Sequence, residues 1–505
     1  MFRLKENKNI LCTLYDREIH ATSTPYKLSL NIMCQLIRSK QTFYKCSWTK
    51  ESLRPIVYDG GLLYFNNHKT SYNIYGFETQ PSLTKLTNIS GSARIMDVIS
   101  YTSPVLKMEC SCKMQTCTCL SRYIMYITKD NWLVLRNPIT GVIFSRVFIK
   151  RSDRIFNFQY IDWNVYAKEV ILTTKLNPEK ELSSIVDVVV NLAVFTTFPL
   201  EFKALLEIRR SVFGKTCRHV NVSDQLLILG MNLDWVHIYS FQDVLEYSIF
   251  TPYKLGDSYM KGNVGMYPVG LPLNCIPQTV PPLLFDVQSS QQIFHFGGYP
   301  FHCVYASTFK HACFVLKQVK ENESHKNCFI DSSTTEDESD MIFFHPDNSN
   351  RIVLKEDGIV RCFQLVYSSN ESKVQEIFSM GFSTVTTQSI STTSFSSFGR
   401  QIKKPINPHI LNEKCVLAVD YDDELDLIGV LGFYPTDPLS EGFIKLYDSM
   451  YGQEVKCIKL NQNLCETNYY ELNIDLDVLI IIEKNERNCF KVYLYKLLHF
   501  TRIMN

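Results

Sequence analysis

Residues 341–365, MIFFHPDNSNRIVLKEDGIVRCFQL, constrain the fold more than any other stretch of the chain. An apolar run, Ile342 to Phe344, stops at His345-Pro346, because proline has no backbone N–H to donate to a strand ladder. After a polar turn come a short apolar strand and Asp357-Gly358, a pair that supplies the positive φ needed in a two-residue hairpin. Alternating residues from Ile359 to Leu365 then predict a third strand, so the segment predicts a small antiparallel meander.

This order of strands and turns resembles the middle of a WD-repeat blade, F-H-P-x-G-x-x-L…D-G-x-V-R-x-W, with Phe363 at the position of the usual Trp. The hairpin that joins the last two strands of such a blade recurs at 133–143 and 444–455, a weaker copy without the Gly stands at 236–244, and 62–67 looks like a further copy. We therefore expect an all-β, WD-repeat-like β-propeller of about seven blades, with eight as the alternative. Propellers serve mainly as platforms that bind other proteins.

The size and composition of the chain agree with a single propeller. Its 505 residues can supply roughly six to eight blades of about 40–50 residues each. The 28 tyrosines and 32 phenylalanines suit a stack of β-sheets. The net charge of +1 provides no bulk field that would attract nucleic acid, so no nucleic-acid partner is expected.

Cysteine usage and hydropathy predict the compartment. Seventeen cysteines, an odd number scattered through apolar strands, indicate free thiols in a reducing environment. The charged segment from Met1 to Asn9 has no apolar stretch behind it, which argues against a signal peptide. The most apolar run, Val188 to Leu200, has 13 residues, fewer than the roughly 20 that a membrane helix needs. We expect a buried strand at 185–198 and no membrane span.

The chain is expected to consist of an N-terminal segment, residues 1–50, and a propeller over residues 51–505. Flexible insertions are predicted near 317–340, which is polar and ends in acidic residues, and near 368–404, which is rich in Ser and Thr. Insertions of this kind decorate the rims of a propeller, where variable binding surfaces belong.

The N-terminal segment is expected to carry one short helix. Helical periodicity runs from Lys27 to Lys40, Thr24 is a good helix cap, and Pro25 suits the first turn. Six apolar residues on this helix form the predicted partner-binding site: Leu28, Leu30, Ile32, Met33, Leu36 and Ile37. A helix this apolar must be buried, either against a partner or against the propeller's own face.

Six segments carry a resemblance to one family: Leu28–Cys34 with Leu36-Ile37-Arg38, SLRPIVYDGGLLYFN at 52–66, Leu192–Phe195 with its flanks, PPLLFDVQSSQQIFHFGGYP at 281–300, IFFHPDNSNRI at 342–352 and VDYDDELDL at 419–427. They resemble the damage-specific-DNA-binding-protein-one- and cullin-four-associated factor seventeen family, substrate receptors of cullin-RING ubiquitin ligases. The resemblance runs from near residue 26 to the C-terminus. It implies a non-catalytic subunit in the nucleus and nucleolus, which docks on the ligase adaptor through its N-terminal helix and presents an unidentified protein for ubiquitination.

Two other functions stay open beside this one. The alternative is a nucleolar propeller scaffold for protein assembly that never engages the ligase, and a propeller hydrolase is a third possibility. Many receptors of this class carry a W-D-x-R box, but residues 162–165 here, Asp-Trp-Asn-Val, reverse the order and lack the Arg. We therefore do not transfer that docking role. Members of the resembled family have also been described as multi-pass membrane proteins, which the short apolar run at 188–200 does not support.

The sharpest local cluster is Cys110, Cys112, Cys117 and Cys119. Four thiolates can bind zinc tetrahedrally. The C-x-C spacing at both ends is less usual than C-x-x-C, however, and the resembled family has no such cluster at this place. Free thiols are therefore favoured over a metal site, and we expect no cofactor.

Two further motifs invite a ligand but fit one poorly. Phe213-Gly214-Lys215-Thr216 resembles the end of a phosphate loop, yet Arg209 stands where the first Gly belongs. The acidic stretch Asp422 to Asp426 lacks the Gly that a calcium loop requires, and its apolar residues alternate as in a strand. We predict a solvated sheet edge there instead.

Overall fold

The structure is a computed structural model. It describes residues 34, 36, 44–59, 61–76, 84–104, 120–150, 158–164, 169–174, 187–197, 199–223, 225–232, 235–253, 258–260, 266–268, 270–288, 294–296, 301–307, 312–318, 324–332, 341–344, 351–356, 359–367, 372–381, 393–395, 401–403, 415–422, 425–433, 441–465, 467–475 and 478–497.

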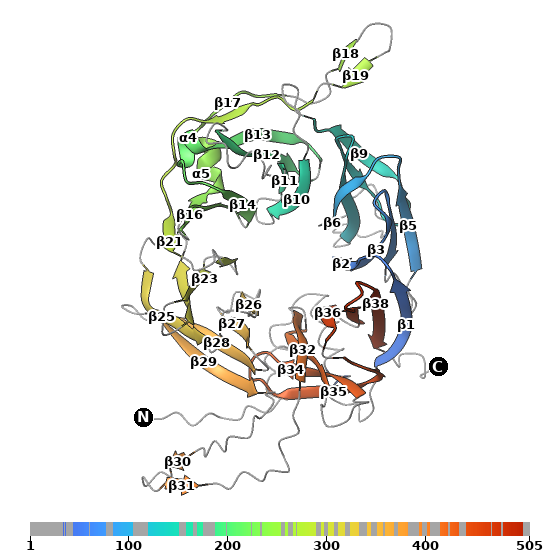
Figure 1. Cartoon of the computed structure of the whole chain (residues 1–505), viewed down its shortest axis with the longest axis vertical. Helices are drawn as coiled ribbons and strands as arrows, with labels where there is room; N and C mark the ends of the chain where they lie inside the picture. The colour runs from blue at the N-terminus through green and yellow to red at the C-terminus, as the bar shows by residue number, and fades with distance from the viewer. Residues whose placement is uncertain are drawn as a thin grey trace, which may run out of the picture. The chain divides into compact units, whose positions relative to one another are not determined.

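Nearly all the described elements are strands, and they form successive antiparallel meanders (Figure 1). Seven of the sheets have four strands, one has six, and two are isolated hairpins. A four-strand meander repeated along the chain is the building unit of a β-propeller, so the predicted all-β propeller class is confirmed. The chain divides into two compact units: unit 1 is Met1–Leu53 with Ser332–Asn505, and unit 2 is Arg54–Asp331.

Unit 2 contains five of the larger sheets. Their meander strands are β2 (Ile56–Asp59), β3 (Leu62–His68), β4 (Ser71–Gly76) and β5 (Thr84–Ser90); β6 (Ile95–Pro104), β7 (Leu120–Thr128), β8 (Trp132–Arg136) and β9 (Ile143–Phe148); β10 (Phe158–Asn164), β11 (Glu169–Thr174), β12 (Val188–Thr196) and β13 (Phe202–Arg209); β14 (His219–Ser223), β15 (Leu226–Gly230), β16 (Trp235–Ser240) and β21 (Phe285–Gln288); and β22 (Phe294–Phe296), β23 (Phe301–Ser307), β24 (Ala312–Gln318) and β25 (Ser324–Ser332).

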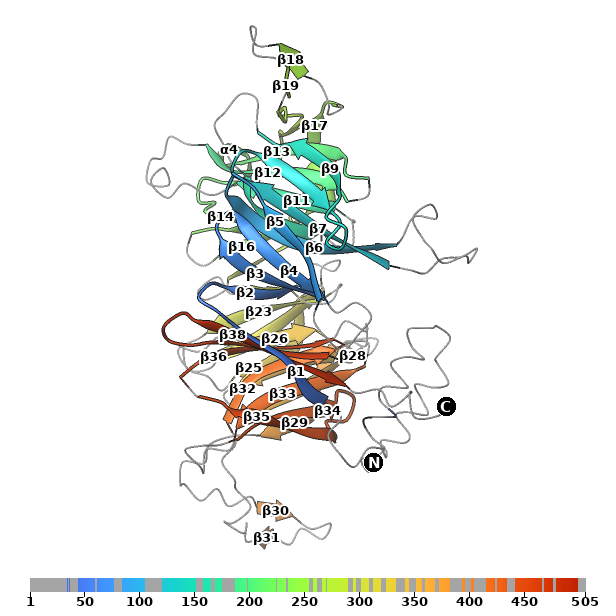
Figure 2. The same cartoon turned by 90° about the vertical axis from the view of Figure 1, so that its right-hand side faces the viewer.

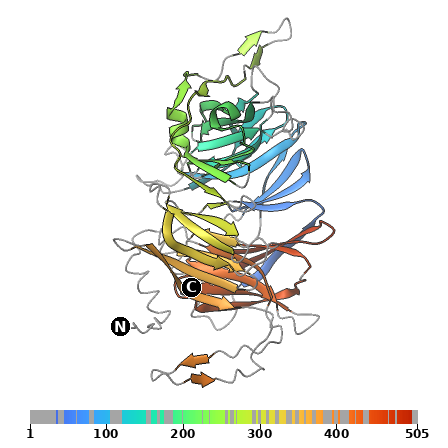
Figure 3. The same ribbon diagram turned by 60° about the vertical axis from the view of Figure 1, so that its left-hand side comes forward.

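The remaining elements of unit 2 are short. They are α4 (Arg210–Phe213), α5 (Phe241–Glu246), β17 (Ser248–Phe250) and β20 (Cys275–Pro277), and the hairpin of β18 (Ser258–Met260) with β19 (Met266–Pro268). Strands β20 and β17 extend the β10–β13 meander to six strands. Figure 3 shows the two helices beside the green strands of this unit. Gly214, at φ 117°, ends α4. Because the helix precedes this Gly, the segment lacks the loop-before-helix order of a phosphate loop.

Unit 1 contains three sheets and one hairpin. Its strands are β26 (Met341–Phe344), β27 (Arg351–Glu356), β28 (Ile359–Tyr367) and β29 (Ser372–Gly381); β30 (Thr393–Phe395) with β31 (Gln401–Lys403); β32 (Cys415–Asp422), β33 (Leu427–Phe433), β34 (Glu441–Asp448) and β35 (Glu454–Asn463); and β36 (Tyr469–Asp475), β37 (Val478–Lys484), β38 (Phe490–Leu497) and β1 (Tyr44–Ser52).

Strand β1 completes the last sheet of unit 1 from the opposite end of the chain. It pairs antiparallel with β38, from Tyr44 opposite Leu497 to Ser52 opposite Phe490, and the two strands run side by side in Figure 2. An ion pair between Lys491 and Glu51 adds to the ladder, with 3.2 Å between Nζ and Oε1. The outer strand of this sheet therefore precedes all the other described strands in sequence.

Three of the predicted hairpins are confirmed. Strands β8 and β9 are joined through Gly141, at φ 73°, and β34 and β35 through Gly452, at φ 68°. Both glycines take up backbone conformations that side-chain-bearing residues rarely adopt. The ladder of β27 and β28 runs to Glu356 opposite Ile359, so only two residues connect these strands.

The hairpin predicted at 236–244 is wrong. After β16 the chain enters helix α5, whose first turn is capped by Ser240: the side-chain oxygen accepts a hydrogen bond from the Asp243 N–H at 3.2 Å. The fourth strand of that sheet is β21, which arrives only after a long excursion. A serine followed three residues later by an acidic residue is a helix start signal, and here it outweighs the blade pattern.

The predicted insertions contain parts of the regular sheets. Strand β25 lies within 317–340, and β29 and the β30–β31 hairpin lie within 368–404. Both β25 and β29 are the last strands of their sheets. An outer strand faces solvent and therefore carries the polar composition that a loop also shows, which explains why composition alone predicts loops there.

The apolar run at 188–200 forms β12, a strand in the middle of its sheet with seven consecutive buried residues. This confirms the strand predicted from its length. Within the part of the chain that is described, no helix is long and apolar enough to cross a membrane.

A repeated polar contact, here called the inter-sheet clasp, joins neighbouring sheets within each unit. In each clasp an Asp or Asn on the first strand of one sheet accepts a hydrogen bond from a backbone N–H of the next sheet along the chain. The clasps join Asp59 to Ser100 (2.7 Å), Asp97 to Ile161 (2.9 Å), Asn164 to Gln225 (2.8 Å) and Asp420 to Ile474 (2.7 Å). Each clasp satisfies an N–H that would otherwise be unpaired where two sheets meet.

Burial raises the pKa of two of the clasp carboxyl groups. Burial raises the pKa of Asp420 to about 6, against the lowering effect of the Ile474 and Tyr421 backbone N–H groups, and nearby Asp422 and Glu471 raise it further. The pKa of Asp97 is also raised, chiefly by burial. A carboxyl whose pKa is higher in the folded than in the unfolded state binds protons better when folded. It therefore loses part of its contribution to stability as the pH rises from its pKa in the unfolded chain to its raised pKa in the folded protein.

We predict that Asp420→Asn flattens part of the pH dependence of stability. The amide keeps an oxygen for the Ile474 N–H, as Asn164 does in its own clasp, but does not ionise. Relative to the variant, the wild type should lose stability between about pH 4 and pH 6. At pH 7.5 the free energy of unfolding of the variant should exceed that of the wild type by at most roughly 3 kcal/mol.

Urea unfolding at pH 4.5, 6 and 7.5 measures this difference. Asp420→Ala is the control: it removes the acceptor, so it should cost roughly 1–3 kcal/mol at pH 4.5 as well. An Asn variant less stable than the wild type at pH 7.5 would contradict the prediction.

Candidate functional site

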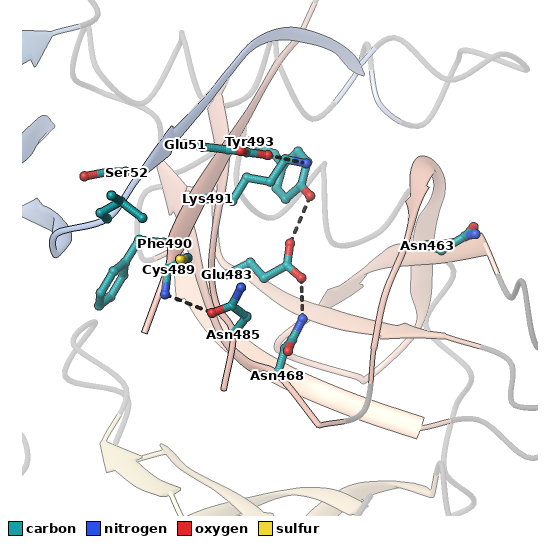
Figure 4. Close-up of a pocket in the computed structure, with 11 residues that line it drawn as sticks. Glu51, Ser52, Asn463, Asn468, Glu483, Asn485, Cys489, Phe490, Lys491 and Tyr493 are labelled. Carbon is teal, nitrogen blue, oxygen red and sulfur yellow. Dashed lines mark hydrogen bonds and ion pairs between the residues drawn. The ribbon is translucent and has the colours of Figure 1, made fainter. Parts of the chain in front are cut away.

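A cavity of about 570 Å³ opens at one end of the β36–β37–β38–β1 sheet in unit 1 (Figure 4). The end of β1, the end of β35, the start of β36, and the β37–β38 hairpin contribute its walls. The lining residues are Glu51, Ser52, Leu53, Asn463, Asn468, Glu483, Asn485, Cys489, Phe490, Lys491 and Tyr493. Its volume falls in the range of cavities that hold small ligands or a partner's side chains.

The Glu483 carboxylate, in this wall, accepts three hydrogen bonds. Its Oε1 accepts hydrogen bonds from Asn468 Nδ2 at 2.6 Å and from the Tyr470 hydroxyl at 3.2 Å. Its Oε2 accepts one from the Tyr493 hydroxyl at 2.9 Å. The donors come from β36, β38 and the turn before β36, so three segments fix one carboxylate, as Figure 4 shows for Asn468 and Tyr493.

Both tyrosines remain donors over the physiological pH range. Burial, together with the nearby Glu483 carboxylate, raises the pKa of Tyr470 to about 12. The pKa of Tyr493 is raised still further by the same causes, burial first. A backbone N–H at Cys465 also donates to the Tyr470 oxygen at 2.9 Å. The hydroxyls are thereby held in the orientation in which they donate to Glu483.

The rim of the cavity is also ordered by polar contacts. Lys491 pairs with Glu51 at 3.2 Å and lies 5.2 Å from the centre of the Tyr493 ring. In the β37–β38 turn, Asn485 Oδ1 accepts hydrogen bonds from the backbone N–H groups of Arg487 at 3.0 Å and Cys489 at 2.8 Å. Such an Asx turn stabilises a tight connection. The cavity is therefore built largely before any partner arrives.

A second polar cluster, in the same unit, corrects the solvated edge predicted at 422–426. Asp426 Oδ1 accepts hydrogen bonds from Arg351 at 3.1 Å, from the Tyr421 hydroxyl at 3.0 Å and from Ser449. Arg351 is 3% exposed and Asp422 is 6% exposed. Arg351 belongs to β27 of the preceding sheet, so Asp426 lies where two sheets meet; Asp423 and Glu424 lie outside the described residues. Sequence alone cannot place Arg351 beside them.

Of the six predicted partner-binding residues, the structure describes only Leu36. Leu36 is helical, 1% exposed, and packed in a cluster with buried residues of the β32–β35 and β36–β38 sheets. It contacts the protein's own core, which leaves it no surface for a partner in this conformation. Cys34, also helical, is half-buried. Leu28, Leu30, Ile32, Met33 and Ile37 lie outside the described residues, and the docking role of the helix stays a prediction.

The predicted cysteine cluster, Cys110, Cys112, Cys117 and Cys119, also lies outside the described residues. Among those that are described, no group of three or more His, Cys, Asp or Glu side chains is arranged to hold a metal ion. Seven cysteines whose side chains are described, among them the buried Cys217, Cys275 and Cys362, form no disulfide.

The cavity residues were missed by sequence reasoning. One signal was present: Glu483 follows five apolar residues, Val478 to Ile482, and immediately precedes a polar turn. A charged residue at the end of a buried strand often reaches the solvated end of a sheet. Its coordination by Asn468, Tyr470 and Tyr493, however, depends on strand register, which the isolated pattern does not specify.

The repeated meanders, the clasps between them and the outer strand supplied by β1 define a WD-repeat-like β-propeller protein. Comparisons with known sequences narrow this class. A sequence model of the family "DDB1- and CUL4-associated factor 17" matches residues 28–497. The chain belongs to this family.

Individual relatives agree with the family match. DDB1- and CUL4-associated factor 17 of Homo sapiens is 26% identical over 489 residues, which cover 94% of this chain and 92% of that protein. The protein of the same name in Danio rerio is 26% identical over 491 residues, covering 93% of this chain and 90% of its own. Among solved structures, the C-terminal WD40 domain of Sif2 aligns with a TM-score of 0.43 at 9% identity, covering 91% of this chain and 100% of that one.

We predict that Leu36→Ala destabilises unit 1 by about 2–5 kcal/mol, because it removes a buried side chain from the core. Leu53→Ala is the matched control, since Leu53 is 82% exposed and should change stability by less than about 0.5 kcal/mol. Urea unfolding followed by circular dichroism measures both. Equal stability of the Leu36 variant and the wild type would show that this side chain is not part of the core.

Proposed function

We propose that the chain is the non-catalytic substrate-recognition subunit of a cullin-four RING ubiquitin ligase, acting in the nucleus. In this role it binds the DDB1 adaptor and presents another protein for ubiquitination. The observation that carries the proposal is the family match over residues 28–497, whose name couples the family to DDB1 and CUL4. The propeller fold supports it, because the contacts between neighbouring sheets hold the connecting loops in place, and these loops offer several surfaces to partners.

The buried position of Leu36 refines how the N-terminal helix would dock. On an ideal helix, residues three, four, seven or eight positions apart share a face. Leu28, Ile32 and Leu36 form one such stripe, and Leu30, Met33 and Ile37 form a second, rotated from Leu36 by roughly 60–120°. Since Leu36 packs in the protein's own core, the first stripe follows it inward, and the second is left for the adaptor.

Apolar contacts on the second stripe contribute to the affinity for a partner. Each buried side chain of this size contributes roughly 1.5–3 kcal/mol. Three of them offset part of the entropy that association costs. One helix can thus pack on the propeller and dock on the adaptor at the same time.

We predict that Leu30→Asp with Ile37→Asp reduces co-purification of DDB1 and CUL4 at least tenfold and leaves the melting temperature unchanged. A charge in an apolar interface is not compensated, so binding is lost. The matched variant, Leu28→Asp with Ile32→Asp, should instead lower the melting temperature, because its stripe is the one that contains Leu36. Affinity purification with mass spectrometry and thermal unfolding read out the two effects.

If the Leu30→Asp, Ile37→Asp variant still co-purifies as much DDB1 as the wild type does, docking through this stripe is refuted. A wild-type chain that brings down nuclear assembly partners and neither DDB1 nor CUL4 would favour the scaffold function over the ligase function.

A further inference from the structure

The Glu483 cavity has an excess of negative charge. Its charged lining residues are Glu51, Glu483 and Lys491, and the one cation among them, Lys491, is already paired with Glu51 at the rim. Within the described part of the chain, the hydrogen-bond donors to Glu483 are an amide and two hydroxyls, all neutral. The wall therefore holds a carboxylate whose charge these contacts leave unneutralised.

The coordination of Glu483 also leaves room for one more donor. A carboxylate offers about four acceptor positions. Asn468 and Tyr470 use two on Oε1, and Tyr493 uses one on Oε2. The remaining position belongs to a group that is already oriented, so a donor entering the cavity need not reorganise it. A cationic donor would form a charge-assisted hydrogen bond, which is stronger than a bond between neutral groups.

The other walls suit a long polar side chain. Asn463 and Asn468 line the cavity with their carboxamides, and Tyr493 and Phe490 add apolar ring surface for a methylene stem; Figure 4 shows Asn468 beside Glu483. Asn468 donates its amide N–H to Glu483, which leaves its oxygen as a further acceptor. Lys491 and Lys484 already lie over the Tyr493 and Phe490 rings, so the acceptors and the fixed carboxylate are what match a guanidinium or ammonium group better than an anion.

We propose that the Glu483 cavity binds the cationic side chain, arginine or lysine, of a protein partner. This inference rests on the proposed function for the partner's identity, which is then a protein presented for ubiquitination. The cavity would make a basic residue part of the recognised sequence. The N-terminal helix stripe remains a separate surface with a separate role.

Saturation-transfer difference NMR on the full-length chain tests the chemistry, because it detects the millimolar affinities expected of single side chains. The probes are Nα-acetyl-arginine amide, Nα-acetyl-lysine amide, their neutral analogue Nα-acetyl-citrulline amide, and O-phosphoserine. Saturation of the arginine or lysine probe should exceed that of the citrulline probe at least fivefold. The ratio of the arginine and lysine signals shows which cation the cavity prefers.

Glu483→Gln should abolish this preference for the charged probes. Glu486→Gln is the matched control: it removes the same charge three residues further along, in the β37–β38 turn, but Glu486 is exposed and does not line the cavity. Equal saturation of citrulline and arginine, an unchanged preference in Glu483→Gln, or saturation of the phosphoserine probe alone would each overturn the proposal. Loss of the preference in Glu486→Gln would do so as well.

Two further measurements decide the test if the variant does not fold, and separate this proposal from the proposed function. If Glu483→Gln does not fold, the wild-type preference for arginine over citrulline decides instead, and it should weaken as salt is raised. DDB1 co-purification of the same variants separates this proposal from the proposed function. Retained DDB1 binding with lost arginine binding supports a distinct recognition cavity. Arginine binding by a wild-type chain that never binds DDB1 would refute the ligase role and leave the cation site standing.

Discussion

The inter-sheet clasp is the contact on which the rest of the structure depends. Each sheet satisfies its own backbone groups through its ladders, but the next sheet presents an N–H, on its first strand or in the turn that follows it, that needs an acceptor. Asp59, Asp97, Asn164 and Asp420 supply it in four places. The contact takes the side-chain carboxyl out of water, which is unfavourable for its charged form. The raised pKa values of Asp97 and Asp420 show this effect. In return the contact fixes the spacing of neighbouring sheets and hence the position of the loops between them.

The cavity in unit 1 follows from this arrangement. Its walls are not strand faces but the ends of strands and the turns that join them, and those ends stay in place because the sheets behind them are rigid. Leu479 and Ile481 of β37 are buried in the same cluster as Leu36 and the β33–β34 core. Two residues further along the same strand, Glu483 leaves the core and enters the cavity wall. One strand thus joins the hydrophobic core to the polar site.

The sequence predicted local turns well and contacts between distant segments poorly. Gly141 and Gly452 were recognised because a hairpin demands their backbone conformation, whatever surrounds it. The turn after β16 was misassigned, since Ser240 and Asp243 serve a helix cap as readily as a loop. Asp426 was taken for a solvated residue because its partner Arg351 lies in another sheet. The coordination of Glu483 could not be predicted for the same reason: register and sheet packing place its donors.

The pairing of β1 with β38 has a consequence for biosynthesis. During translation β1 is made before every other described strand, whereas β38, to which it hydrogen-bonds, is made after all of them. Until then the nascent chain exposes an unpaired strand, the kind of edge that recruits other strands and promotes aggregation. The β1–β38 sheet can therefore form only after β38 has left the ribosome, and a chaperone that shields β1 in the interval would raise the yield of folded protein.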